Sequence, residues 1–579
     1  MNKLHMKVLF LHPEDTPNGG KWSRERWDLI VDLGFAGQGV YAEWSQRQKT
    51  RVLSIHEFAK SAQSYRWVNE VFDRGRGRLL DRTGLDWWEI LAMERYQDIH
   101  TLYLFHQLRK EFGSAELTVA ASRPHSATKS AEQLFAVPIP CFETARVGPI
   151  QKAVRALGTA RNLRVEQILE IALDKWDSGY RIRRQWARGR AEVKNPCMLL
   201  PSAYSNVTRS ELAYAEQLPS RQFLLVTTRK NANPARVPGN VAVASLASYA
   251  LPLKSIQDEE AELQQAWRAF ASQMSAEVEE FRMCANACVW DYFPGHLKQG
   301  LLLRDAWSRL LREEPVVGVL CGDDLNFHTR LPLILAHRQG LNSAYCSHGA
   351  LDSGFFFKRP FSSHFLVKGE MEKDYLERAA AIDAARIIVA APGVRKFVGR
   401  RESDGEAIVF FSQPYEIAGG RGDLIYREIM PRLHAVARAN GRKLIVKLHP
   451  FESKRARQAL LKSSLTTADA FEIVDGTTPE QVISRAWCGV TLDSSVAMEC
   501  ALSEIPFFLC GWLDFTGDGY LQQFAKFGVA HVLDRPEEIQ RIPSLVAGYR
   551  PDAAILRRLW QEGDPNQLET VLFGPGNSH

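Results

Sequence analysis

The chain has 579 residues, more than a single hydrophobic core serves, so we expect at least two domains. It is 45% hydrophobic and 24% charged with a mean hydropathy of −0.24, and no apolar stretch approaches the roughly 18 residues that a membrane span needs. The net charge of +6 suits a protein that meets anionic ligands or a membrane surface, and it is too small to indicate a nucleic-acid binder.

The first strand and the cysteines indicate in which cellular compartment the protein is expected. The run MKVLFLH (6–12) predicts a β-strand rather than a signal peptide, because it is short and no small-residue cleavage site follows it. Nine cysteines are dispersed without zinc-finger spacing, which favours reduced thiols in a cytosol. We therefore expect a cytoplasmic protein.

Strand-like and helix-like segments then alternate along the first half, which is typical of a mostly parallel sheet covered by helices. We expect strands at 6–12, 51–55, 116–122, 197–204, 221–229, 315–324 and 343–350. We expect helices at 24–35, 98–112 and 330–340. Residues 150–195 and 256–313 are long, charged and helical in period, so they predict a helical insertion or cover.

A second α/β series begins near residue 405. Its expected strands are 406–414, 443–450, 471–476, 488–495 and 506–511, and its expected helices are 424–440, 453–463, 479–486 and 496–503. The pattern predicts an α/β protein of two Rossmann-like, doubly wound domains, with a ligand cleft at the carboxyl ends of their strands. We place the domains at 1–395, with the two helical insertions, and at 396–579, ending in a C-terminal helix.

The strand IVKLHPFE (445–452) carries two cationic side chains at its end. Lys447 and His449 are two residues apart, so they share one face of the strand, at the edge where open α/β sheets bind ligands. Together they predict a phosphate or diphosphate site. The alternative is a buried histidine bonded to a backbone carbonyl and a lysine that extends to solvent.

The segment GVTLDSSVAMECALSEIPFF (489–508) predicts a strand, a tight polar turn and a helix. Ser494 or Ser495 would cap the helix, and Glu499 would lie one turn on, where its carboxylate could bind the hydroxyls of a ribose. The alternative is an ordinary capped helix with an exposed glutamate. A Gly-rich loop, SQPYEIAGGRGD (412–423), adds Gln413, Gly419 and Gly420 as candidate ligand-binding residues, or is a surface loop.

Two polar segments follow strands in the first half, CGDDLNFHTR (321–330) and CSHGALDSG (346–354). His348 is the leading candidate for a general base, because a neutral imidazole can accept a proton from a hydroxyl. Asp324 and Asp323 are rival bases or orienting groups for His348, and helix capping is the alternative for both.

The densest basic stretch, RIRRQWARGR (181–190), predicts a solvated helix face or, alternatively, contact with an anionic lipid at the inner face of the cytoplasmic membrane.

Over roughly residues 315 to 540 the order of several motifs resembles a known family. The runs AYCSHGALDSG, SHFLVKGEMEKDYLERA, IVFFSQP, LIVKLHPFES and GVTLDSSVAMECALSEIPFF resemble the bacterial surface-polysaccharide GT-B glycosyltransferases. The same order of motifs resembles the capsule and lipopolysaccharide transferases that use CMP-activated sugars such as Kdo or sialic acid. It is also similar to the CDP-glycerol glycerophosphotransferases.

The resemblance implies a division of roles between the two domains. The 1–395 domain would hold the acceptor and a catalytic His348. The 396–579 domain would bind donor phosphate through Lys447 and His449 and the nucleotide through Ser494, Ser495 and Glu499.

We therefore expect a GT-B-like glycosyltransferase that works without a metal or other cofactor. It would move a sugar from a nucleotide-sugar, best a CMP-linked one, to an oligosaccharide or lipid-linked acceptor, with His348 or Asp324 as the base and with no nucleic acid bound. A CDP-polyol phosphotransferase, a sugar-nucleotide 2-epimerase and a non-catalytic scaffold in polysaccharide assembly are the alternatives.

Overall fold

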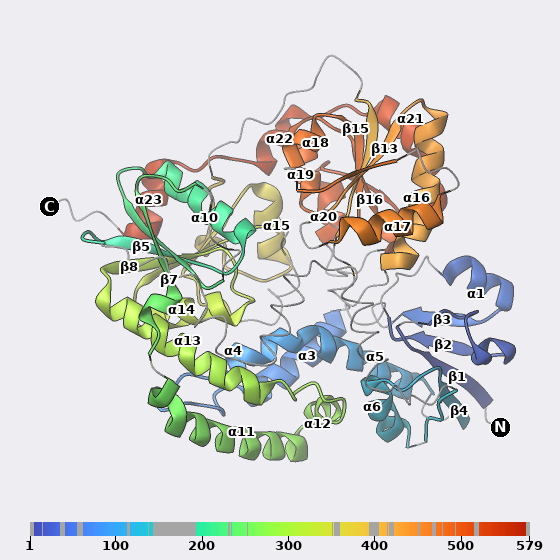
Figure 1. Ribbon diagram of the computed structural model, residues 1–579, viewed down its shortest axis with the longest axis horizontal. Helices are drawn as coiled ribbons and strands as arrows, with labels where there is room; N and C mark the ends of the chain where they lie inside the picture. The colour runs from blue at the N-terminus through green and yellow to red at the C-terminus, as the bar shows by residue number, and fades with distance from the viewer. Residues whose placement is uncertain are drawn as a thin grey trace.

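The computed structural model has three parallel β-sheets, each flanked by helices (Figure 1). It describes residues 5–574 except 14, 35–40, 55–61, 113–115, 137, 143–192, 230–231, 233, 235, 252, 350, 352–358, 393–404, 414, 416–421, 450–451, 466–470, 477–478, 493 and 514–519. The predicted α/β class with Rossmann-like sheets is confirmed. The sequence indicated two sheets, and the third arises because the first strands form a sheet of their own.

The N-terminal unit is built on a four-stranded sheet of order β3-β2-β1-β4. Its strands are β1 (His5–Leu11), β2 (Leu29–Asp32), β3 (Arg51–Ser54) and β4 (Glu116–Ala121). Its α-helices are α1 (Ala42–Gln48), α3 (Ala62–Gly75), α4 (Trp87–Leu91), α5 (Tyr96–Phe112) and α6 (Ser126–Phe135), with the short 3-10 helices η1 (Lys21–Arg24) and η3 (Ala92–Arg95).

The middle unit holds a seven-stranded sheet of order β11-β10-β9-β8-β5-β6-β7. Its strands are β5 (Cys197–Ser202), β6 (Gln222–Thr227), β7 (Val241–Ser245), β8 (Val316–Cys321), β9 (Asn342–Cys346), β10 (His364–Val367) and β11 (Ile387–Val389). Its helices include α10 (Ser205–Gln217), α11 (Gln257–Glu277), α12 (Glu279–Asn286), α13 (Phe293–Glu313), α14 (Phe327–Arg338) and α15 (Glu370–Arg378). The 3-10 helices η5 (Leu246–Tyr249), η6 (Leu253–Ile256) and η8 (Ala384–Arg386) complete it.

The C-terminal unit holds a six-stranded sheet of order β14-β13-β12-β15-β16-β17. Its strands are β12 (Ala407–Phe411), β13 (Lys443–Lys447), β14 (Phe471–Val474), β15 (Ala486–Thr491), β16 (Phe507–Cys510) and β17 (His531–Leu533). Its helices are α16 (Gly422–Ala439), α17 (Lys454–Ser464), α18 (Pro479–Ile483), α19 (Val496–Leu502), α20 (Tyr520–Lys526), α21 (Ile542–Gly548) and α22 (Ala553–Leu559), with η9 (Gly511–Leu513) and η10 (Pro536–Arg541).

The last helix, α23 (Pro565–Phe573), returns to the middle unit (Figure 1). Leu568 and Leu572 are buried in the same cluster as Leu200 and Leu320 of the seven-stranded sheet. The C-terminal helix predicted for the 396–579 domain therefore exists, and it packs on the other sheet.

The predicted strands of both series are confirmed, and the central strands are buried apolar runs that are covered on both faces. β5 is buried along its whole length, and β12 is buried at all five positions. The helices expected at 256–313 are also confirmed, as α11, α12 and α13. The insertion expected at 150–195, except for its last three residues, lies outside the described residues, and so does the basic stretch 181–190.

The helix predicted at 24–35 is wrong, because its centre is the strand β2. All four residues of β2 are buried, and the strand pairs in parallel with β1 through Leu29 to Asp32. Four consecutive apolar and acidic residues fit a helical period as well as a short buried strand. The hydrogen-bonded pairing with β1 made this segment a strand, and the periodicity of the sequence does not reveal that pairing.

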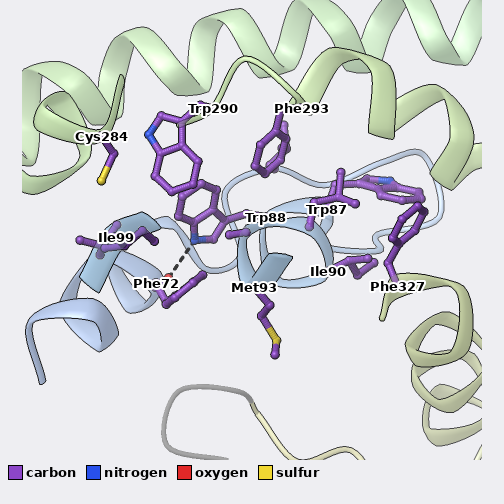
Figure 2. Packing of buried hydrophobic residues seen from close by; sticks show 14 of the residues in the cluster. Phe72, Trp87, Trp88, Ile90, Met93, Ile99, Cys284, Trp290, Phe293 and Phe327 are labelled. Atoms are coloured by element: carbon purple, nitrogen blue, oxygen red, sulfur yellow. Dashed lines mark hydrogen bonds between the residues drawn. The ribbon is translucent and has the colours of Figure 1, made fainter. Parts of the chain in front are cut away.

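The N-terminal and middle units share one hydrophobic core. Trp88 of α4 lies among aromatic rings of the helical cover, with its centroid 5.1 Å from that of Trp290 and 5.2 Å from that of Phe270. Figure 2 shows Trp88 between Trp290 and Phe293, with its indole N–H donating to the Phe72 carbonyl at 3.0 Å. The helices α11 to α13 therefore bind the extra sheet to the rest of the molecule.

Within the described residues, no helix is both long enough and apolar enough to cross a membrane.

Candidate functional site

A cavity of about 820 Å³ lies where the middle and C-terminal units face each other. The middle unit contributes α10 along its whole length and the loop after β9, including His348. The C-terminal unit contributes α18 and α19, including Ser495 and Glu499. Three of the residues predicted from sequence, one from the first domain and two from the second, thus line one cavity.

His348 is oriented by a backbone carbonyl. Its Nδ1 lies 2.6 Å from the carbonyl oxygen of Gly322, in the turn after β8. Because a carbonyl oxygen only accepts, Nδ1 carries the proton, and in the neutral ring Nε2 is the nitrogen that can accept one. The tautomer that this bond selects is the one that a general base needs.

The loop that carries His348 is held by Lys368, which follows β10 and also lines the cavity. The Lys368 ammonium donates to the Ser347 carbonyl at 2.9 Å and to a carboxylate oxygen of Glu372 at 2.9 Å. Glu372 is fully buried. Sequence reasoning missed both this pair and the strand β10 before it, although the apolar run HFLV followed by lysine, with glutamate four residues on, was a usable signal.

The two aspartates of the turn after β8 lie elsewhere. Asp324 is buried, 3.8 Å from the guanidinium of the fully buried Arg330, and it is not among the described residues that line the cavity. The Asp323 carboxylate accepts from the Leu325 amide at 3.1 Å. The N-cap of α14 is Asn326, so capping by either aspartate, the alternative from sequence, is wrong.

Lys447 and His449 lie close together at the end of β13. Burial lowers the pKa of His449 to about 4, and the positive charge of Lys447 contributes a smaller part of this shift. Lys447 is 8% exposed, and its ammonium donates to the Leu448 carbonyl at 2.8 Å. Neither residue is among the described residues that line the cavity, so a ligand phosphate would have to extend beyond it to meet them.

A buried network missed from sequence fixes the turn after His449. One carboxylate oxygen of Glu452 accepts from Ser412 at 2.8 Å and from Arg457 Nε at 2.7 Å. The other oxygen accepts from the His449 amide at 2.8 Å. Glu452 and Arg457 are each 1% exposed. A glutamate three residues beyond the histidine and an arginine five residues further were the signal, in FESKRAR (451–457).

Of the two serines before α19, one occupies the N-cap position and the other makes the side-chain hydrogen bond to the helix. Ser495 is the N-cap residue, in a helical conformation, and its side chain makes no capping bond. The Ser494 hydroxyl accepts from the Val496 amide at 3.4 Å. Ser495 and Glu499 line the cavity together, as expected for positions four apart on a helix.

The Gly-rich loop is described only in part. Gln413 follows β12 and is half-buried, and it is not among the described residues that line the cavity. Gly419 and Gly420 lie outside the described residues.

Helix α10 supplies a polar wall that sequence reasoning missed. Ser205, Thr208 and Arg209 lie on its first turns and line the cavity. Four glutamates line the cavity: Glu216 on α10 itself, Glu480 on α18, Glu499 on α19 and Glu562 after α22. A ligand there meets hydroxyls and carboxylates on both units, and cationic side chains, among them Arg209 and Lys368, on the middle unit. Polar residues after the buried β5 were the available signal.

Among the described residues, no group of three or more histidine, cysteine, aspartate or glutamate side chains could hold a metal ion.

We expect His449 to titrate near pH 4 rather than near its ordinary 6.5. The unfolded chain then takes up a proton first as the pH falls below 6.5, so this group lowers stability progressively between pH 6.5 and 4. NMR of the imidazole against pH measures it, and Lys447→Met should raise the midpoint by removing a positive charge. A midpoint near 6.5 in the wild type would contradict the burial described above.

Comparisons with known proteins found only distant likenesses. A scan against protein-family models found no match, and neither did a search of curated proteins. Among solved structures, a putative UDP-N-acetylglucosamine 2-epimerase from Listeria monocytogenes matches with 9% identity and a TM-score of 0.40, over 64% of this chain and 92% of its own. The UDP-GlcNAc 2-epimerase from Methanocaldococcus jannaschii matches with 12% identity and a TM-score of 0.40, over 65% and 98%. CalG4, the calicheamicin glycosyltransferase, matches with 13% identity and a TM-score of 0.39, over 66% and 96%. At these identities and TM-scores the likenesses carry no conclusion about activity.

Proposed function

We propose that the protein is a glycosyltransferase of GT-B-like architecture that transfers a sugar from a nucleotide-activated donor, best a CMP-linked one, to a hydroxyl of a surface-polysaccharide or glycolipid acceptor. The observation that carries the proposal is His348, whose Nδ1 is held by a carbonyl, in one cavity with Ser495 and Glu499 of the opposite unit. A base and a set of ribose- and phosphate-compatible groups on two facing units are what such a transfer requires.

In the proposed reaction, His348 Nε2 takes the proton of the acceptor hydroxyl as its oxygen attacks the anomeric carbon. The bond between that carbon and the donor phosphate oxygen breaks, and the phosphate leaves with the electron pair. Arg209 on the middle unit and Lys447 on the C-terminal unit would stabilise its growing negative charge as cations, and the neutral His449 would do so as a hydrogen-bond donor. The chemistry needs no metal ion, because cationic side chains can serve this purpose.

On the donor side, Glu499 would accept hydrogen bonds from the ribose hydroxyls, and Ser494, Ser495 and Gln413 would bind phosphate or base. A carboxylate that accepts from two neighbouring hydroxyls favours a nucleoside over a free phosphate. This assignment accounts for a carboxylate and a hydroxyl side by side on α19, opposite the cationic Arg209 of α10.

We expect CMP or CDP to stabilise the protein, and UDP, GDP and ADP to have little effect, in a thermal-shift screen. A ligand at 100 times its dissociation constant stabilises by about 2.7 kcal/mol, because it binds only the folded state. Glu499→Gln and His449→Ala should abolish the shift, whereas Glu472→Gln, a glutamate paired with Arg485 on the same unit, should leave it intact.

A response to UDP or GDP alone would contradict the cytidine donor. No response to any nucleotide would contradict the enzyme and favour a scaffold.

A second candidate, a sugar-nucleotide 2-epimerase, is favoured by one observation, the four glutamates that line the cavity. A carboxylate can remove a proton from carbon as well as bind hydroxyls. Incubating the protein with the donor alone in deuterated water separates the two: an epimerase exchanges the C2 proton without acceptor, and a glycosyltransferase does not.

The acceptor is proposed to be lipid-linked or an oligosaccharide, with peripheral contact at the inner face of the cytoplasmic membrane through the basic stretch 181–190. Sedimentation with vesicles containing anionic lipid tests this contact, and binding that is insensitive to salt would contradict it.

A further inference from the structure

Glu211 is a carboxyl group in an unusual place. It lies in α10 between Ser210 and Leu212, which line the cavity, and its side chain is fully buried. Burial raises the pKa of this carboxyl well above its ordinary range, and the charge of Asp323 raises it further. Burial therefore favours the uncharged form of this carboxyl. Helix glutamates normally face solvent, so its burial requires a reason.

The reason lies in what Glu211 contacts. One of its oxygens accepts a hydrogen bond from the Gly322 amide at 2.9 Å. The carbonyl of the same glycine accepts from His348 Nδ1 at 2.6 Å. Both backbone polar groups of Gly322 are thus engaged, one by α10 and the other by the candidate base.

Gly322 could not be replaced by a larger residue without loss of this arrangement. A Cβ there would lie 2.9 Å from Val207 Cγ1, in α10 one turn before Glu211. The close approach lets a side chain of α10 reach the backbone after β8. Three segments that are far apart in the sequence, α10, the turn after β8 and the loop after β9, are joined by two hydrogen bonds.

We propose that Glu211 is a positioning residue for His348: by holding the Gly322 amide, it keeps the Gly322 carbonyl on Nδ1 and leaves Nε2 as the nitrogen that accepts a proton. The orientation of the ring follows from the contacts alone. Its use in catalysis rests on the proposed function.

Two substitutions separate the hydrogen bond of Glu211 from its volume. A carboxyl and an amide both present an acceptor oxygen, so Glu211→Gln should keep the Gly322 bond. Glu211→Met fills a similar volume without an acceptor and leaves the buried Gly322 amide unpaired. A residue that merely filled space would be replaced better by methionine than by glutamine.

The test is NMR of the full chain with 15N-labelled histidine, with the His348 signals assigned by their loss in His348→Gln. We expect an unprotonated Nε2 and a protonated Nδ1 in the wild type and in Glu211→Gln. In Glu211→Met we expect the neutral ring to shift toward the tautomer protonated on Nε2. A protonated Nε2 in the wild type would overturn the proposal, and so would a Glu211→Gln variant that behaves as Glu211→Met does. The wild-type and Gln measurements decide the matter even if the Met variant does not fold.

Activity gives a second measurement. Glu211→Met should lower kcat by about 10- to 100-fold, part of the rate that a general base supplies, with KM for the donor unchanged and the acid limb of the pH profile displaced. Glu211→Gln should restore the rate and the profile. The NMR result needs no substrate, so a failure of the proposed function leaves it standing, and a failure of the tautomer assignment leaves nucleotide binding by the C-terminal unit untouched.

Discussion

Replacing His348 by alanine is expected to lower kcat by about 10²- to 10⁴-fold, the range that a positioned general base contributes. The Gly322 carbonyl holds Nδ1 at 2.6 Å, so the loss removes a base that is already in its working tautomer. Nucleotide affinity should change little, because Ser495 and Glu499 belong to the other unit. Steady-state kinetics with the donor found in the thermal-shift screen, together with that screen on the variant, measures both quantities.

His531→Gln is the matched control, since His531 is an exposed histidine on β17 and is not among the described residues that line the cavity. It should keep the wild-type rate. Asp324→Asn tests the rival base. A larger loss of kcat there than in His348→Ala, with the thermal unfolding unchanged, would transfer the role of base to Asp324 and contradict our assignment.

Glu452→Ala is expected to destabilise the C-terminal unit by about 3–5 kcal/mol, because it leaves a buried guanidinium without its partner. Arg457 is 1% exposed, and its Nε donates to Glu452 at 2.7 Å. The same change frees the His449 amide and the Ser412 hydroxyl. Urea unfolding followed by a probe in the C-terminal unit measures the loss.

The control lies in the same sheet. Glu472 on β14 pairs with Arg485 at 2.7 Å, and the side chains are 43% and 30% exposed. Glu472→Ala should therefore cost no more than about 1 kcal/mol, since water screens an exposed pair and replaces the lost partner. Equal losses from the two variants would mean that burial does not set the strength of the Glu452 network.

The sequence predicted the site best where a residue's place along the chain fixes its place in space. Parallel strands end at one edge of a sheet, so polar residues directly after buried strands were expected to meet there. This reasoning found His348 after β9 and Ser495 with Glu499 after β15, and all three line the cavity. The spacing of four on a helix also brought Ser495 and Glu499 to one face.

It failed where pairing with a distant strand decided the outcome. β2 carries a pattern that suits a short helix or a short strand, and its pairing with β1 made it a strand. For the same reason the sequence did not predict the separate four-stranded sheet of the N-terminal unit. In the part of the chain that the structure describes, β1 pairs with β2 and β4 and with no strand of the middle unit. This depends on hydrogen bonds between segments up to about a hundred residues apart.

The amino-acid sequence by itself thus determined the α/β class, most strands, and which polar side chains stand at the carboxyl edges of the sheets, because periodicity and the direction of a strand are local. The tertiary structure alone decided what those side chains do. Lys447 turns to a backbone carbonyl, Asp324 lies against Arg330, and His348 is fixed through Gly322 by Glu211, which lies 111 residues earlier than that glycine. Burial and the choice of hydrogen-bond partner depend on groups that only the folded chain brings together, and these set the charge and the tautomer on which chemistry depends.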